Sequence, residues 1–303
     1  MSSRRVGVIS AVSAFTLWGL LPVYLKALRG VAPVEVVLHR IVWLLAFLCV
    51  VLALGKRWSA LRAAFESRKT VLTSLVSGGL LSANWLTYVW AVDASRVVDA
   101  SLGYFINPLV NVLLGMLVLG ERLRPVQWAA IALAALGVLW LALPLGEPPW
   151  IGLTLAGTFG AYGLLRKTAV LGSLEGLALE TLMLFPLAAV ALAGLFWSGR
   201  AAFVQAEPGL LLLLVLAGPV TGVPLLLFTA GARRIPLSLL GVLQYIGPSV
   251  QLLLGVLVWH ETFPAAKAAG FSLIWLALLV FGVEGLVTSR ARYAAVPPGT
   301  VQR

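Results

Sequence analysis

The segments GYFINPLVNVLLGMLVLGE (residues 103–121) and LQYIGPSVQLLLGVLVWHE (residues 243–261) decide how this chain is organised. They align without a gap at a constant offset of 140 residues, so that Pro108 corresponds to Pro248. The same offset pairs Ile106 with Ile246, Asn111 with Gln251, Gly115 with Gly255, and Glu121 with Glu261. Because unrelated apolar sequence rarely reproduces such a set, we infer an internal duplication.

The composition indicates that lipid is the solvent of most of the chain. Hydrophobic residues make up 61% of its 303 positions and charged residues 11%, whereas soluble domains are about 45–50% apolar and about 25% charged. Several apolar runs reach the roughly 20 residues that an α-helix needs to cross the membrane. We predict an all-α integral membrane protein with ten transmembrane helices, at residues 6–25, 34–55, 71–92, 100–119, 125–144, 150–169, 175–197, 209–229, 237–258 and 267–288.

The duplication and the number of spans together predict two inverted repeats. Five spans are an odd number, so the second copy enters the membrane from the opposite side and a two-fold axis in the membrane plane relates the copies. The predicted units are a first repeat at residues 1–146, a second at 147–288, and a disordered tail at 289–303. Inverted repeats suit alternating access to a central site.

The basic residues predict the orientation. With a cytoplasmic N-terminus, about sixteen of the 22 lysines and arginines fall on the cytoplasmic side and about five on the other, which is the bias that sets topology. Both termini are then cytoplasmic, and we expect a multi-pass protein of the cytoplasmic membrane. The net charge of +11 does not form one basic patch with interleaved aromatic residues, so nucleic acid is not an expected partner.

Four ionisable residues in the second and seventh predicted spans are candidate site residues. Glu35, His39 and Arg40 are in the second span, where positions 35 and 39 are one helical turn apart. Such groups cost about 2.5–3.5 kcal/mol in a helix centre and usually face a cavity or a partner. One interpretation is an anion site at Arg40 with Glu35 or His39 as a proton relay; the other is snorkelling towards the outer interface. Glu180 either binds a proton or forms a structural ion pair with Arg40.

Polar and aromatic residues in three spans are candidates for a substrate path. In the repeated segments, proline leaves a carbonyl without its helical donor and predicts a kink, although such kinks often serve packing only. The candidates there are Tyr104, Asn107, Gln244 and Tyr245, with kinks at Pro108 and Pro248. Asn84 and Tyr88, one turn apart in the third span, suit either a polar solute or helix packing.

Motifs for other chemistries are absent from the sequence. It has no GxxxxGK[ST] phosphate loop, and His260-Glu261 is not followed by the second histidine of HExxH. The single cysteine, Cys49, excludes an intrachain disulfide and has no metal-ligand spacing. We therefore expect no cofactor, no metal, no catalytic residue and no enzyme activity, with energy supplied by a gradient or by the solute itself.

The chain resembles the RarD family, a branch of the EamA-type permeases in the drug/metabolite transporter superfamily, over nearly all of residues 6–288. The matching residues are Leu17-Trp18-Gly19 with Pro22, Tyr24 and Lys26; Glu35 with His39-Arg40; Asn84-Trp85 with Trp90-Ala91-Val92; SLGYFINPL from Ser101 to Leu109; Tyr162 to Lys167; Glu180-Thr181; Thr221 with Pro224-Leu225; and Gln244-Tyr245-Ile246 with Pro248. The resemblance implies a ten-helix inverted-repeat exporter or permease of the cytoplasmic membrane, linked with chloramphenicol resistance or sensitivity. It does not supply a substrate.

Three classes of function remain open from the sequence. The leading hypothesis is a secondary transporter that moves a small metabolite or drug-like molecule, with a proton as a candidate coupling ion and a homodimer as a candidate assembly. A non-transporting membrane scaffold or sensor fits the absence of catalytic motifs but leaves the inverted repeat unexplained. An enzyme acting on lipid-linked substrates would need a convergent base, nucleophile or metal set that the sequence does not contain.

Overall fold

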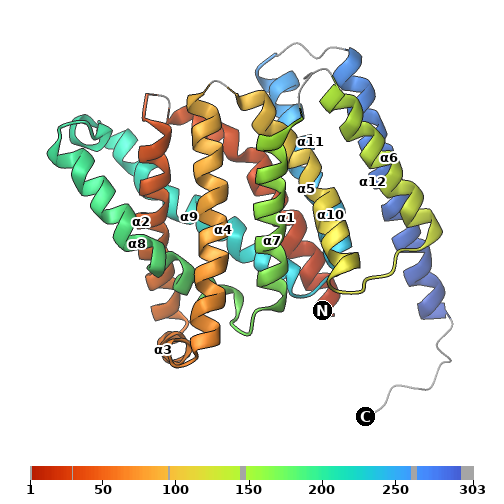
Figure 1. The fold of residues 1–303 in the computed structure, drawn as a ribbon, viewed down its shortest axis with the longest axis horizontal. Coiled ribbons are helices and arrows are strands. Elements are labelled where there is room, and N and C mark those ends of the chain that lie inside the picture. Colours follow the sequence, from red (N-terminus) through yellow and green to blue (C-terminus); the bar gives the residue numbers. More distant parts are fainter. Residues whose placement is uncertain (1, 29, 95, 144–147, 261–264, 295–303) are drawn as a thin grey trace.

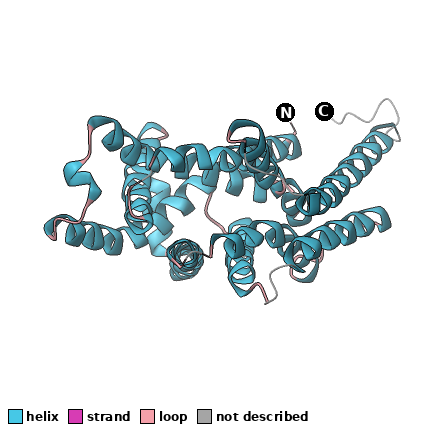
Figure 2. Cartoon of the chain, turned by 90° about the horizontal axis from the view of Figure 1, so that it is seen from above, coloured by secondary structure: helices cyan, strands magenta, loops and turns pink. Residues whose placement is uncertain are grey.

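The computed structural model describes residues 2–28, 30–94, 96–143, 148–260 and 265–294, and this part of the chain is built from helices and loops without a strand (Figures 1 and 2). The α-helices are α1 (Ser3–Ala27), α2 (Pro33–Leu54), α3 (Trp58–Glu66), α4 (Arg68–Asp93), α5 (Val97–Leu117), α6 (Pro125–Ala142), α7 (Trp150–Thr168), α8 (Ser173–Trp197), α9 (Pro208–Ala232), α10 (Leu237–Gln244), α11 (Ile246–Leu253) and α12 (Ala265–Ala294). A 3-10 helix, η2 (Ala202–Gln205), and a π-helix, η3 (Leu254–Val258), complete them.

Every predicted span coincides with a helix, but length and hydropathy alone support fewer membrane crossings. Six helices of the described part are long and apolar enough to cross a bilayer: α1, α2, α6, α8, α9 and the continuous segment Leu237–Val258. Leu102–Leu117 and Ala268–Glu284 are shorter apolar helical segments. The all-helical membrane fold is therefore confirmed, whereas the count of ten remains a prediction.

Helices of the two predicted halves interleave. The principal contacts run from α1 to α9 and α11, from α2 to α8 and α9, from α4 to α7 and α8, from α5 to α7 and α10, and from α6 to α12. Figure 1 shows the α2–α8 pair at one edge of the bundle and the α6–α12 pair at the other. The predicted boundary at 146/147 lies outside the described residues, as do Glu261 and residues 295–303, and α12 continues to Ala294, beyond the predicted span end at 288.

Glycines allow the closest helix contacts. A Cβ atom at Gly218 of α9 would lie 2.3 Å from the carbonyl oxygen of Trp43 in α2, and one at Gly241 of α10 would lie 2.6 Å from the carbonyl oxygen of Pro108 in α5. Small residues of this kind let membrane helices approach closely, where dispersion and short polar contacts replace the hydrophobic effect.

The two repeated prolines act differently on their helices. The helix breaks at Tyr245, between α10 and α11 and three residues before Pro248, as expected where proline removes a backbone donor. α5 continues from Val97 to Leu117 with Pro108 inside it. The helix is therefore interrupted near Pro248, whereas α5 is continuous at Pro108, and the two kinks stay predictions.

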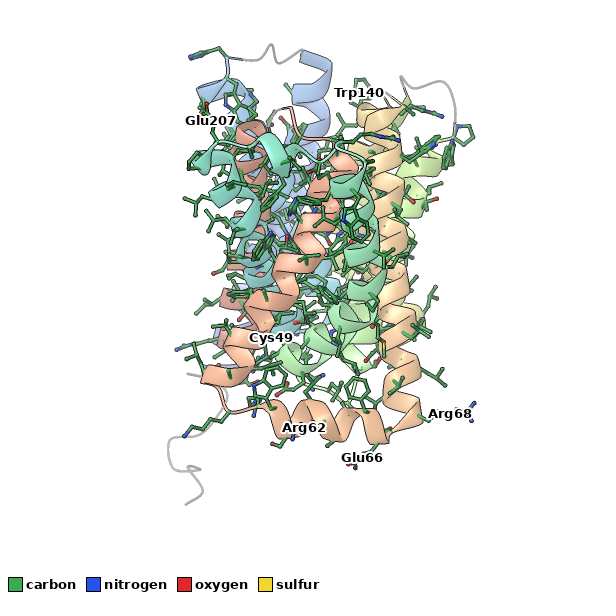
Figure 3. The ribbon with its side chains drawn as sticks, turned by 90° about the vertical axis from the view of Figure 1, so that its left-hand side faces the viewer. Cys49, Arg62, Glu66, Arg68, Trp140 and Glu207 are labelled. Carbon is green, nitrogen blue, oxygen red and sulfur yellow. The ribbon has the colours of Figure 1, made fainter. Side chains whose placement is uncertain are left out.

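The two ends of the bundle are identified by the residues that lie there. α1 begins and α12 ends at the lower edge of Figure 1, where α3 lies. Figure 3 places Arg62, Glu66 and Arg68 together at this end, and Glu207 and Trp140 at the opposite end. We call them the α3 end and the Glu207 end. Between them, large apolar side chains such as Leu187, 77% exposed, cover the outer surface, as lipid contact requires.

Candidate functional site

A cavity of about 140 Å³ lies inside the bundle, between helices of both predicted halves. Its lining includes six of the predicted site residues, Arg40, Asn84, Tyr88, Tyr104, Asn107 and Gln244, together with Pro248. Lining residues Leu25 and Tyr88 lie near the C-terminal ends of α1 and α4, and Ala100 lies near the beginning of α5. The cavity is therefore closer to the Glu207 end than to the α3 end.

Arg40 supplies the positive charge of the cavity. Its Nε donates a hydrogen bond of 2.9 Å to Thr221 Oγ1 in α9. Its guanidinium carbon lies 4.9 Å from the ring centre of Trp85, a cation–π contact. The phenols of Tyr88 and Tyr104 line the same cavity.

A chain of amides connects three helices at the floor of the cavity. Asn107 Nδ2 donates to the Ala156 carbonyl at 3.0 Å, and Asn111 Nδ2 donates to both Asn107 Oδ1 at 3.0 Å and Gln244 Oε1 at 2.9 Å. Asn111 is fully buried, and its Oδ1 has no hydrogen-bond partner. Sequence reasoning did not select Asn111 as a site residue, although its pairing with Gln251 in the repeat was a signal that could have done so.

The walls of the cavity are aromatic. Phe15, Trp18, Phe159 and Phe228 pack with neighbouring ring centres 5.1 to 6.0 Å apart. The rings of Tyr88 and Tyr104 meet edge to face at 6.4 Å. Of these six rings all but Phe228 line the cavity, so a solute there meets rigid apolar surface on several sides.

Asn84 joins the cavity wall to α7. Its Nδ2 donates to the Leu155 carbonyl at 2.9 Å and to Thr158 Oγ1 at 3.0 Å. Both sequence-based interpretations of Asn84 therefore have structural counterparts, because the residue lines the cavity and also ties two helices together.

Tyr245, Glu35 and His39 do not line the cavity. The Tyr245 hydroxyl donates to the Phe105 carbonyl at 3.2 Å in a buried cluster with α12. Glu35 accepts hydrogen bonds from the backbone N–H groups of Ala202 and Phe203 at 3.1 and 3.3 Å. His39 Nδ1 accepts from the indole of Trp43, while its Nε2 lies 3.7 Å from Glu35 and has no hydrogen-bond partner.

Glu180 pairs with a different arginine from the one predicted. It is fully buried, and its Oε1 lies 3.3 Å from Arg166 Nη1 while Ser77 and Tyr162 donate to it. The predicted ion pair with Arg40 is wrong, because Arg40 turns towards Thr221 instead.

The α3 end is closed by side-chain contacts. Glu121 accepts hydrogen bonds from the backbone N–H groups of Leu237 and Ser238 and from the Ser238 hydroxyl, at 2.6 to 2.9 Å. These bonds satisfy donors at the beginning of α10. Arg57 Nε lies 2.8 Å from Glu175 Oε1 at the same end. Within the described residues, no group of three or more metal-ligating side chains occurs.

A multi-pass helical bundle with an apolar outer surface and a polar, partly charged cavity inside has the architecture of a membrane transporter. The EamA-like transporter family matches residues 5–143. A protein named Uncharacterized transporter from Vibrio cholerae is 46% identical over 95% of this chain and 95% of its own length. Protein RarD from Streptomyces exfoliatus is 44% identical over 98% of this chain and 95% of its own. Chloramphenicol-sensitive protein RarD from Pseudomonas aeruginosa is 33% identical over 94% of this chain and 97% of its own length.

This chain therefore belongs to the EamA-like transporter family, as a relative of its RarD proteins. The predicted resemblance is confirmed, and the molecule is a membrane transporter. A crystal structure of a protein 23% identical to it superposes with a TM-score of 0.67, covering 90% of this chain and 96% of the other. That likeness shows a shared fold.

Proposed function

We propose that this protein is a secondary transporter of the cytoplasmic membrane that exports a small metabolite or drug-like molecule by alternating access. In this proposal ten helices form two inverted repeats, residues 1–146 and 147–288, and both termini are cytoplasmic. The observation that carries the proposal is the cavity, in which Arg40 from the first half and Gln244 from the second face the same space.

The pattern of helix contacts supports the inverted repeat. The proposed repeat makes α1 equivalent to α7, α2 to α8, α4 to α9, α5 to α10–α11, and α6 to α12. When each helix is replaced by its equivalent, every principal contact becomes another principal contact or itself. The α1–α9 contact becomes α7–α4, and α5–α7 becomes α11–α1, while α2–α8, α5–α10 and α6–α12 map onto themselves. Two-fold related halves would give this pattern.

The closed α3 end supports alternating access. With the Glu121 bonds to α10 in place and the cavity nearer the Glu207 end, this conformation is the outward-facing one in the proposed orientation. Exchange of the two halves' conformations would break these bonds and open the cavity towards the α3 end. In the proposal, His39 or Glu180 carries the coupling proton.

The test compares metabolites released by cells that express the wild-type chain, Arg40→Ala or Glu180→Gln at equal membrane abundance. Arg200→Gln is the matched control, because Arg200 is exposed at the Glu207 end and does not line the cavity. We expect a specific compound to accumulate outside with wild type and Arg200→Gln and to fall with Arg40→Ala. Chloramphenicol sensitivity is scored in parallel, because one RarD relative is named for it.

Unchanged release, uptake and drug sensitivity in all four strains would contradict the proposal. A non-transporting scaffold or sensor would then be the better account. Cross-linking of the expressed chain in membranes tests the proposed homodimer separately, since an apolar helix face can meet lipid or a second copy.

A further inference from the structure

Within the described part of the chain, the cavity holds the positive charge of Arg40 and is lined by no acidic side chain. Arg40 is the only charged residue among those that line it. Its Nε is occupied by Thr221, and its two terminal nitrogens make no hydrogen bond to the described residues. The fork of the guanidinium is thus available to whatever enters the cavity.

Three other arginines of the bundle are paired with carboxylates. Arg166 contacts Glu180, and Arg57 contacts Glu175. Arg124 contacts Glu284. Because an unpaired cation inside a membrane protein costs free energy, an arginine that faces the cavity without such a partner indicates an anionic ligand.

The surroundings of Arg40 define the rest of the ligand. Trp85 lies beneath the guanidinium, and Trp18, Tyr88, Tyr104 and Phe159 contribute further rings to the lining. A cavity of about 150 Å³ is known to accept a benzene molecule, and this one measures about 140 Å³. The space therefore fits roughly one six-membered ring with a small substituent.

We propose that the substrate class is the single-ring aromatic monocarboxylates, with the carboxylate bound by the terminal nitrogens of Arg40 and the ring packed against the aromatic wall that includes Trp18, Phe159 and Tyr104. A planar guanidinium matches a carboxylate with two parallel hydrogen bonds. This inference rests on the proposed function, since it assigns the solute of the same cavity.

The test uses three probes of nearly equal shape and different charge: phenylacetate, phenylacetamide and 2-phenylethylamine. Their binding to the purified full chain in lipid nanodiscs is measured by calorimetry at pH 7. We expect phenylacetate to bind at least about tenfold more tightly than either analogue, as a charge-assisted hydrogen bond implies. Arg40→Gln should remove this preference, Arg40→Lys should retain part of it, and Arg200→Gln should leave it unchanged.

Two results would overturn the inference. One is amide or amine binding as tight as that of phenylacetate, and the other is no binding of any probe to wild type. Because these comparisons use the wild-type chain, they hold even where Arg40→Gln does not fold. The release experiment separates the two proposals: a neutral or cationic exported compound contradicts the substrate class alone. Arg40-dependent binding of phenylacetate without any change in release contradicts transport alone.

Discussion

Replacing Arg166 with methionine removes one member of the buried ion pair that joins α7 to α8. Glu180 is 0% exposed and Arg166 is 1% exposed, so solvent does not screen the charge that remains. Removing one partner of such a pair costs about 3–5 kcal/mol. Because the shift per kcal/mol shrinks as chains grow, the unfolding midpoint of Arg166→Met should fall by several degrees, on the order of 5–10 °C.

The double variant Arg166→Met/Glu180→Leu should recover most of this loss, because it leaves no unpaired charge in the bundle. Recovery should stop short of wild type by about 1–2 kcal/mol, since the carbonyls of Gly172 and Ser173 also lose their Arg166 donor. The assay is thermal unfolding of the wild type, both single variants and the double variant in one detergent, analysed as a double-mutant cycle. If the losses of the single variants simply add in the double variant, the two residues are not coupled and the reasoning fails.

Three further changes test other contacts of the bundle. Gly241→Val should lower the stability by at least about 1–3 kcal/mol, because its Cβ would lie 2.6 Å from the Pro108 carbonyl oxygen; a thermal midpoint equal to wild type would contradict this. Glu35→Gln should weaken the two bonds to the beginning of η2 by about 1–3 kcal/mol in total, and cleavage by protease at residues 198–207 should become faster. Glu121→Gln should free the beginning of α10, which Glu121 binds in the wild type. A cysteine that replaces the buried Leu237, in a chain without Cys49, should then react faster with a membrane-impermeant maleimide added from the α3 end. Unchanged labelling would argue against a closed end held by Glu121.

The sequence predicts the helices well because hydropathy reports directly on contact with lipid. Charged loops and apolar runs identify every long helix to within a few residues. The short helix α3 was not predicted, because nine residues at the membrane surface have neither the length nor the apolar content of a span. Six of the polar candidates line the cavity, because polar residues in apolar helices rarely face lipid, whereas its aromatic walls and Gln251 were not selected.

The sequence does not define which way each helix is rotated. Gln244 and Tyr245 are adjacent, so on a helix they point about 100° apart, and only Gln244 faces the cavity while Tyr245 packs towards α12. Nor does it define partners across the bundle. Glu180 lies in a helix next in sequence to that of Arg166, but its distance along the chain alone does not separate Arg166 from Arg40 as its partner. The folded arrangement brings Arg166 Nη1 to 3.3 Å from Glu180 Oε1.

The charges at positions 40 and 180 have a consequence for the energetics of any two-state cycle. These positions correspond through the 140-residue offset, yet one holds a cation open to the cavity and the other an anion bound to Arg166. If the proposed inverted repeat holds, the two halves are not interchangeable at this position. Under the proposed alternating access, exchange of their conformations would then place unlike groups in equivalent surroundings, and the two states would differ in free energy. A ligand could reverse the resting preference only through its difference in affinity for the two states.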